Sequence, residues 1–519
     1  MTQQPPLLPQ LESAPLARRQ LLGAVLAAGV APGWLRQARA QGVERFAQGV
    51  ASGFPRPDGM VLWTKLCGTE LPEAVPVQWE IAKDEQFSQV LQQGEVQALA
   101  RDAHCLRVEP RGLAPDRWYW YRFSALGQRS AVGRTRSAPA PDAAVRQLRF
   151  AIASCQHWEA GRYAAWADMQ AQNPDLVMFL GDYIYEYRRG AKAAAGRQHP
   201  NHECLTLQDY RERYALYKSD PQLQAMHAAA PWVLTWDDHE VANDYAGDVG
   251  QDLAPNFAAL RHAAVQAYWE HLPFPEAWRP REGAMQLYRS LDWGQLARVI
   301  TLDDRQFRAP HACPQPGRGG ANTVTLEQCP ALADPQRSLL GTAQEAWLAR
   351  QWDRQRWNLL AQQTLMAGLT WQDREAHGGL YWTEGWNGYM ATRDRLLQGL
   401  HAARARNTVV LGGDVHANYV AQLHLDALNV SGPVLASEFC GTSISSHGMA
   451  QSRIDAARPF NPQLLHARSD ERGYVLFELS PKLLQAQLRS VLEPERADSA
   501  VAVQARFVVE DGRPGPQAA

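Results

Sequence analysis

Residues 176–187 constrain the fold of this chain more than any other stretch, and they read Leu-Val-Met-Phe-Leu-Gly-Asp-Tyr-Ile-Tyr-Glu-Tyr. The apolar first half is typical of a strand buried on both faces, and Gly181 and Asp182 follow at its carboxyl end. Open α/β sheets bind their ligands at that end of the strands. Asp182 and Tyr185 are three residues apart, so a turn after the strand would bring a carboxylate and a phenol to one point. The alternative is a strand that ends in an aspartate and has aromatic residues covering its edge.

Strands and helices alternate from residue 146 onward, which predicts an α/β (α+β) domain over residues 146–510. We expect a mostly parallel sheet that is covered by helices on both faces. The expected strands lie at residues 148–153, 176–180, 232–236, 296–302, 408–412, 434–439 and 475–478. The expected helical stretches lie at residues 162–172, 207–229, 257–271, 345–366 and 392–405.

The region before this domain has a different pattern. Short alternating strands at residues 75–81, 105–108 and 118–123 are separated by turn signals, which predicts an all-β sandwich over residues 41–136. Gly112-Leu-Ala-Pro ahead of Trp118 resembles the tyrosine-corner region of fibronectin/Ig-like sandwiches. Residues 137–144 are rich in Ala and Pro and are interpreted as a linker.

Residues 1–40 are interpreted as an export signal rather than as part of the fold. Arg18-Arg19 precedes an apolar run at residues 21–31, and Ala38-Arg39-Ala40 fits a cleavage site before Gln41. The pattern resembles a twin-arginine (Tat) signal, so the Tat translocase is an expected partner and the mature protein is expected in the periplasm or secreted. The apolar run is shorter than the roughly 20 residues that span a bilayer, and we expect no membrane span in the mature chain. The alternative is an uncleaved tail.

The near-zero net charge and the tryptophan content indicate what kind of partner this chain binds. The 52 basic and 54 acidic residues leave a net charge of -2, which gives no sign of a nucleic-acid-binding or acidic-membrane surface. Partners are therefore expected to be small molecules. Tryptophans recur near the motifs discussed below, which fits either an aromatic-walled cleft or an ordinary core. They are Trp158, Trp236, Trp382 and Trp386.

Seven cysteines leave at least one without a disulfide partner inside the chain. Cys313 and Cys329 bracket a loop rich in Pro and Gly, and we expect them to form a disulfide. Cys155 stands directly after an expected strand and is the best candidate for another role.

Cys155 belongs to a pattern in which several expected strands end in a metal-ligand residue type. Asp182, Asp238 and the pair Asp414 and His416 end other strands in the same way, and Asp, His and Cys are ligands of transition metals. We expect these ends to lie along one edge of one sheet and to form a metal site. Taken alone, a residue such as Cys155 is more often a small buried hydrophobe than a ligand, and one such as His416 is more often a hydrogen-bonded core residue.

These motifs resemble a known family. Gly-Asp-x-x-Tyr at residues 181–185 is similar to the metal-binding motif of purple acid phosphatases, and residues 46–479 as a whole are identified as a member of the PhoD-like alkaline phosphatase and phosphodiesterase family of calcineurin-like metallophosphatases. The matching segments are residues 48–53, 61–64, 154–156, 181–187, 236–243, 302–308, 413–416 and 438–443. Asp304 and Cys440 depart from the family pattern beside these motifs.

The resemblance implies a metallophosphatase-like core that holds iron(III) with calcium ions beside it. Cys155, Asp182, Tyr185 and His416 match the iron ligands of the family, and a carboxylate such as Asp182 can bridge two ions. Asp238 and Asp414 replace an amide and an imidazole found in most metallophosphatases, and the hard oxygen ligands suit Ca²⁺. The amide oxygen of Asn243 is a further candidate ligand. Manganese, magnesium and zinc remain alternatives, because they take similar ligands.

Two residues are candidates for direct roles in phosphoester hydrolysis. His239 is adjacent to Asp238 and either protonates the leaving group or orients Asp238. Arg305 either holds phosphate oxygens with its guanidinium fork or forms a salt bridge to Asp303 or Asp304.

The expected function is that of an exported, metal-dependent alkaline phosphatase acting on small phosphomonoesters and phosphodiesters. A phospholipase D-like phosphodiesterase is an alternative, since the site chemistry does not select the leaving group. A non-catalytic, metal-stabilised binding protein is a second alternative. His239 beside a full ligand set argues against it, because a structural metal site needs no acid.

Overall fold

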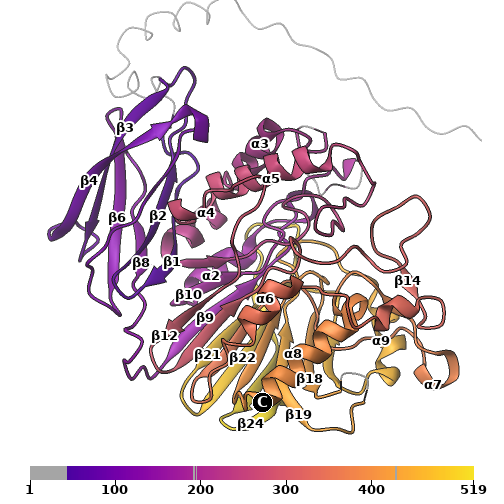
Figure 1. Cartoon of the computed structure of the whole chain (residues 1–519). Helices are drawn as coiled ribbons and strands as arrows, with labels where there is room; N and C mark the ends of the chain where they lie inside the picture. Colours follow the sequence, from indigo (N-terminus) through magenta and orange to yellow (C-terminus); the bar gives the residue numbers. More distant parts are fainter. Residues whose placement is uncertain (1–43, 191–192, 194–195, 201, 427–428) are drawn as a thin grey trace, which may run out of the picture. The chain divides into compact units, whose positions relative to one another are not determined.

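Two large mixed β-sheets form the frame of the computed structural model, which describes residues 44–519 apart from 191–192, 194–195, 201 and 427–428 (Figure 1). Arg45–Ala519 make up one compact α+β unit. The expected export signal, residues 1–40, lies outside the described residues. Within the described part of the chain, no helix is both long and apolar enough to span a bilayer.

The first sheet has the segment at residues 176–187 at its parallel centre. β9 (Leu148–Ala153), β10 (Leu176–Phe179) and β11 (Trp232–Leu234) run parallel, and nearly all of their side chains are buried. Strands that are apolar on both faces need cover on both faces. The sheet order is β24-β23-β22-β21-β9-β10-β11-β1-β2-β5. Its outer strands are β1 (Val50–Arg56), β2 (Gly59–Lys65), β5 (Cys105–Val108), β21 (Arg472–Leu479), β22 (Leu483–Val491), β23 (Val501–Glu510) and β24 (Arg513–Ala518).

The second sheet holds three of the expected strands, those at residues 296–302, 408–412 and 434–439, so the expectation of one sheet was wrong. Its order is β12-β13-β15-β17-β19-β18-β20, with β13, β15, β17 and β19 parallel. Alternation of strands and helices indicates parallel pairing but does not say which strands pair. The strands are β12 (Arg289–Trp293), β13 (Ala297–Thr301), β15 (Trp357–Ala361), β17 (Thr408–Gly412), β18 (Asn418–His424), β19 (Val434–Cys440) and β20 (Leu464–Arg468).

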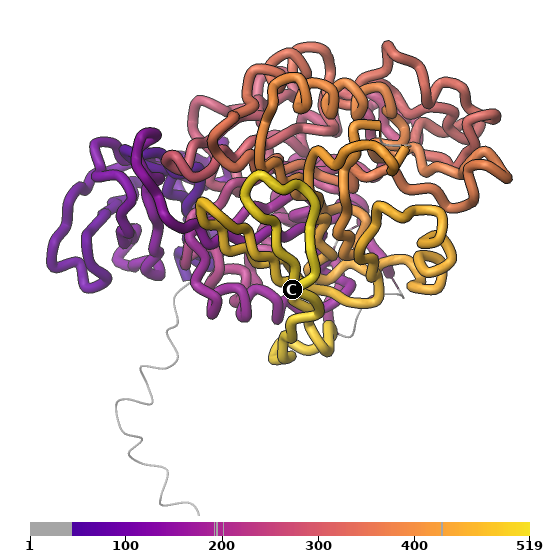
Figure 2. The backbone as a smooth tube through the Cα atoms, turned by 90° about the horizontal axis from the view of Figure 1, so that it is seen from below, coloured from indigo at the N-terminus to yellow at the C-terminus, as the bar shows by residue number. Residues whose placement is uncertain are grey.

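The largest hydrophobic cluster contains residues of both sheets, among them Phe150 and Val177 from the first and Val299 and Leu411 from the second. Helices cover the outer faces, and a second cluster lies under the helices of the second sheet. Figure 2 shows the indigo N-terminal strands at the left and the yellow C-terminal strands near the centre, and the strand order puts β1, β2 and β5 toward one end of the first sheet and β24 at the other. The first sheet packs on α2 (Ala164–Ala171), α3 (Leu207–Tyr217), α4 (Pro221–Ala229) and α5 (Phe257–His271), and the second on α6 (Gly341–Leu348), α8 (Met390–Ala402) and α9 (Gln451–Ala457).

The predicted helix at residues 345–366 is wrong. α6 ends at Leu348, and Trp357–Ala361 form β15 between β13 and β17. The segment is rich in helix-forming residues, but all five residues of β15 are buried, and pairing on both sides overrides helix propensity there. Two short strands, β14 (Thr323–Val324) and β16 (Tyr381–Trp382), pair with each other outside the large sheets, and α7 (Arg374–His377) lies between β15 and β16 in the chain.

The N-terminal strands form a further sheet in the order β4-β3-β6-β7, with β8 also paired to β6. A separate hydrophobic cluster joins this sheet to β1, β2 and β5. The Tyr119 hydroxyl donates to the carbonyl oxygen of Ala114 at 2.9 Å, the contact expected of a tyrosine corner. β1 continues the first sheet through a parallel pairing of Gly53 with Trp232. The strands are β3 (Ala74–Ala82), β4 (Val90–Leu99), β6 (Trp118–Ala125), β7 (Gln128–Arg129) and β8 (Gly133–Arg136).

Candidate metal centre

The predicted metal ligands come from the carboxyl ends of strands in both sheets, and not from one edge of a single sheet as expected. Cys155, Asp182 and Asp238 follow β9, β10 and β11 of the first sheet. Ala153, Phe179 and Leu234 are register partners, which brings these three ends level with one another. Asp414 and His416 follow β17 of the second sheet. The site therefore lies where the parallel strands of the two sheets end against each other.

The backbone conformation is strained at four of these positions. Cys155, Asp182, Asp414 and His416 have φ values of +58°, +59°, +65° and +52°. Non-glycine residues in this left-handed region cost about 1–2 kcal/mol each, and such residues concentrate at functional sites. Gly181 shows why the turn before Asp182 needs glycine, since its φ is +115° and an added Cβ would lie 2.4 Å from the Cβ of Asp237.

The four predicted iron ligands converge in one buried cluster. Ligand atoms of Cys155, Asp182 and His416 lie within 4.8 Å of one another. The Tyr185 hydroxyl donates to Asp182 Oδ2 at 2.7 Å and lies 3.1 Å from His416 Nε2. Asp182 Oδ1 is buried and has no hydrogen-bond partner among the described residues. A thiol, a carboxylate, a phenol and an imidazole at these separations fit a metal ion, and the unpartnered oxygen is free to bind one.

Neighbouring groups orient this cluster. His416 Nδ1 is 2.9 Å from the carbonyl oxygen of His447 and donates to it, which leaves Nε2 unprotonated on the side of Tyr185. Ser446 places its hydroxyl 2.7 Å from the Tyr185 oxygen. Burial, and then the charge of Asp182, raises the pKa of both Cys155 and Tyr185. A bound cation reverses that direction, because positive charge favours the thiolate and the phenolate.

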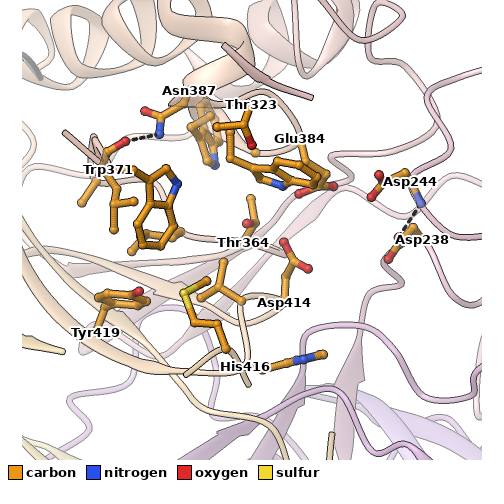
Figure 3. Close-up of a pocket in the computed structure, with 18 of the residues that line it drawn as sticks. Asp238, Asp244, Thr323, Thr364, Trp371, Glu384, Asn387, Asp414, His416 and Tyr419 are labelled. Carbon is orange, nitrogen blue, oxygen red and sulfur yellow. Dashed lines mark hydrogen bonds between the residues drawn. The ribbon is translucent and has the colours of Figure 1, made fainter. Parts of the chain in front are cut away.

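A second group of oxygen ligands lies beside the cluster, in a cavity of about 390 Å³. Asp238, Asn243 and Asp414 line it, as do two acids that the sequence analysis missed, Asp244 and Glu384 (Figure 3). Asn243 donates its amide N–H to Gln251 at 2.6 Å, so its amide oxygen is available to a cation. Asp244 directly follows the motif at residues 236–243 and could have been found there. Glu384 follows the two-residue strand β16, outside every motif, and carries no comparable signal.

His239 has the environment of a proton donor. Its Nδ1 donates to Glu186 Oε2 at 2.8 Å, and its ring packs on Tyr185 with 4.2 Å between ring centroids. Burial alone would lower the pKa of His239, but the negative charges of Asp238, Glu186 and Asp182 together raise it well above its ordinary value. The ring also lines the cavity. Glu186, which the sequence analysis did not single out, is therefore the residue that orients His239.

Arg305 is fully buried and does not line the cavity. Its guanidinium forms ion pairs with Asp237 and Glu384 and lies 3.5 Å from Asp238. It makes no side-chain ion pair with Asp303 or Asp304; only its backbone N–H contacts Asp303, at 3.1 Å. Burial raises the pKa of Asp238, but Arg305 and then His239 outweigh it and hold that pKa well below its ordinary value. Arg305 thus keeps a ligand carboxylate charged.

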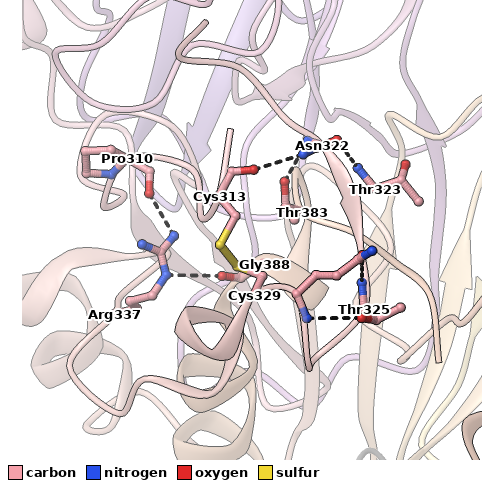
Figure 4. Close-up of a disulfide and its surroundings, with 10 residues drawn as sticks. Pro310, Cys313, Asn322, Thr323, Thr325, Cys329, Arg337, Thr383 and Gly388 are labelled. Carbon is pink, nitrogen blue, oxygen red and sulfur yellow. Dashed lines mark hydrogen bonds between the residues drawn. A yellow bond between two sulfur atoms is a disulfide. The ribbon is translucent and has the colours of Figure 1, made fainter. Parts of the chain in front are cut away.

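The structure confirms the disulfide between Cys313 and Cys329, which closes the loop that carries β14 (Figure 4). Of the tryptophans singled out in the sequence, Trp382 and Trp386 line the cavity, whereas Trp158 and Trp236 do not. Trp382 and Trp386 therefore fit the aromatic-walled cleft, and Trp158 and Trp236 fit the alternative of ordinary packing.

Comparison with known proteins identifies the family of the chain. The model of the PhoD-like phosphatase family matches residues 150–488, and that of the PhoD-like phosphatase, N-terminal domain, matches residues 31–139. The chain is 40% identical over 487 residues to alkaline phosphatase D of Bacillus subtilis (strain 168), which covers 91% of this chain and 82% of the relative. A solved structure of PhoD, 38% identical, superposes with a TM-score of 0.85 over 91% of this chain and 92% of that one. These matches confirm the family expected from the motifs: the chain belongs to the PhoD-like phosphatase family and is a phosphoric ester hydrolase.

Proposed function

We propose that the protein is an exported alkaline phosphatase that hydrolyses phosphomonoesters and phosphodiesters at a centre of Fe(III) and Ca(II). The convergence of Cys155, Asp182, Tyr185 and His416, with one carboxylate oxygen unpartnered, is the observation that carries this proposal. The name of the Bacillus subtilis relative, alkaline phosphatase D, supports the reaction class.

The two groups of side chains differ in the cation that they suit. Cys155 and Tyr185 add a thiolate and a phenolate to a carboxylate and an imidazole, a set suited to Fe(III). Asp238, Asn243 and Asp414 offer only oxygen, which suits Ca(II), and Asp182, which belongs to the cluster and also lines the cavity, would serve both groups. When bound, such ions lower the pKa of a coordinated water and neutralise the charge on the phosphoryl oxygens.

The chain's own residues then handle charge and protons. His239, whose Nδ1 donates to the Glu186 carboxylate, donates a proton to the oxygen of the departing alcohol. Arg305, buried behind the carboxylates, positions Asp237, Asp238 and Glu384 instead of touching the substrate. The burial of Arg305 favours this positioning role over the phosphate clamp considered from the sequence.

We also propose the domain assignment and the route of export. Residues 41–136 form the N-terminal β-domain, residues 146–510 form the catalytic domain, and residues 1–40 form a Tat signal that is removed before Gln41. Expression with Arg18 and Arg19 both replaced by lysine tests the route. The variant should accumulate uncleaved in the cytoplasm, and normal export of it would refute the Tat assignment.

Hydrolysis of p-nitrophenyl phosphate and of its bis ester, with metal analysis on the same sample, tests the activity. We expect both esters to be cleaved at alkaline pH by protein that contains iron and calcium. Cleavage of the monoester alone would refute phosphodiesterase activity. Full activity in protein without iron would refute the Fe(III) assignment.

A further inference from the structure

The cavity at the metal centre has two chemically different ends. Asp238 and Asp244 lie at one end, Trp371 and Tyr419 lie at the other, and Asp414 and His416 lie between them (Figure 3). The acidic end holds the ligands already described. The aromatic end holds no candidate metal ligand or acid among the lining residues described, so the proposed chemistry leaves it without a role.

We propose that the aromatic end is a leaving-group subsite for phosphoesters whose alcohol carries a planar aromatic ring, such as a benzyl group or a nucleobase. The inference rests on the proposed phosphatase function and adds a substrate class to it. The apolar lining is made of Leu365, Ala367, Leu369, Trp371, Trp382, Trp386, Tyr419 and Met449. Aromatic side chains offer flat faces that favour stacking with another ring over contact with a flexible chain.

Trp382 is the most unusual member of this wall. The residue is 41% exposed, whereas Trp386, which also lines the cavity, is fully buried and is fixed by a hydrogen bond to Gln362. An indole that stays exposed inside a cavity is available to a ligand, because protein atoms do not cover it. Trp386 forms part of the fixed floor, and Trp382 supplies accessible ring surface.

The segment that carries Trp382 is held in place. β16 pairs with β14, with Thr323 opposite Trp382, and the loop containing β14 is closed by the disulfide. Asn322 accepts from the backbone N–H of Thr383 at 2.9 Å and donates to the Cys313 carbonyl at 3.0 Å (Figure 4). The loop closed by the disulfide thus holds the backbone of the segment that carries Trp382.

Trp371 is fixed on the other side. Its backbone N–H donates to Leu380 at 2.9 Å, and Asn387 donates to the neighbouring Leu369 carbonyl at 2.8 Å. The guanidinium of Arg453 lies 4.5 Å from the Trp371 ring centroid, a cation–π contact that holds the indole at the cavity wall. An indole that is already fixed, as that of Trp371 is, loses little conformational entropy when a ring binds, which favours a planar ligand.

Benzyl phosphate and cyclohexylmethyl phosphate test the proposal, because both release a primary alcohol and differ in whether the ring is flat. We expect the wild-type enzyme to prefer benzyl phosphate by about ten-fold in kcat/KM, the effect of stacking on an aromatic side chain. Trp382→Leu should bring this ratio close to one, and Trp382→Phe should keep most of it. Trp347→Leu is the matched control, since Trp347 lies on α6, packs on Tyr288 and does not line the cavity.

A second arm compares adenosine 5′-monophosphate with ribose 5-phosphate, which differ only in the base and so test a nucleobase as the source of the ring. Equal kcat/KM for flat and saturated rings in the wild type would overturn the subsite while leaving the phosphatase function standing. The same fall for both esters in Trp382→Leu would also overturn it, because it would show a structural role. A preference for octyl phosphate over benzyl phosphate would show that the apolar lining binds an aliphatic chain, and this too would overturn the subsite for a planar ring. Failure to cleave any of these esters would refute the proposed function itself.

Discussion

Replacing Glu186 with glutamine removes a negative charge beside His239 while keeping the size of the side chain. The carboxylate of Glu186 accepts from His239 Nδ1 at 2.8 Å through one oxygen and from the backbone N–H of Asn243 at 2.7 Å through the other. An amide can accept at only one of its ends, so it must turn a donor toward His239 or Asn243. The variant therefore weakens the protonated form of His239 through the lost charge in either orientation, and also through the lost hydrogen bond when the amide donor faces His239.

The expected shift in the pKa of His239 follows from the hydrogen bond that is lost. A buried hydrogen bond to a charged group contributes about 1.5–3 kcal/mol, and about 1.36 kcal/mol corresponds to one pKa unit. His239 donates its proton in the proposed reaction, and its raised pKa means that activity is present below that pKa and is lost as the pH rises through it. In Glu186→Gln the alkaline limb of the kcat/KM profile should move to lower pH by about one to two units.

The measurement is a profile of kcat/KM against pH for both proteins, with metal content determined on each. Glu212→Gln is the matched control, because Glu212 is exposed on α3 and contacts only the neighbouring part of its own helix through Gln208. An unchanged alkaline limb in Glu186→Gln protein that keeps its metals would refute His239 as the titrating acid.

Three further substitutions separate the roles assigned to other residues. Cys155→Ser should lose most of its iron, since a neutral hydroxyl is a far poorer ligand than a thiolate; full iron content by metal analysis would exclude Cys155 from the site. Cys313→Ser should lower the free energy of unfolding by about 2–4 kcal/mol in urea titration with metal content intact, and unchanged stability would contradict a bridged loop. Arg305→Gln removes the guanidinium that neutralises Asp237, Asp238 and Glu384, so the free energy of unfolding should fall by about 3–5 kcal/mol. A variant as stable as the wild type would show that the carboxylates do not depend on Arg305.

The strands that deliver the metal ligands were predictable because their signals are local. β9 and β17 were predicted at the residues observed, as was α5, and β10 within one residue. A buried parallel strand has a continuous apolar run, and Gly181 and Gly413 mark the ends of β10 and β17. The same local signal placed Cys155, Asp182 and His416 at strand ends.

Features that depend on tertiary contacts were not predictable in this way. Helix-forming residues surround Trp357–Ala361, and only pairing between β13 and β17 makes that segment a strand. The division into two sheets depends on which strands pair, which periodicity does not report. Glu384 enters the site because β16 pairs with β14, and Arg305 turns inward because three carboxylates surround it. No short motif encodes either arrangement.

The visible absorption spectrum of the native protein, recorded with its iron content, tests the central claim most directly. A phenolate bound to Fe(III) gives a charge-transfer band, and Tyr185 holds its oxygen 2.7 Å from Asp182 and 3.1 Å from His416. We predict one iron per chain and a violet to pink colour that is absent in folded Tyr185→Phe protein and that survives removal of calcium with EGTA, while activity is lost. A colourless, iron-free protein with full activity on manganese or zinc would contradict the assignment of Cys155, Asp182, Tyr185 and His416 to a ferric centre.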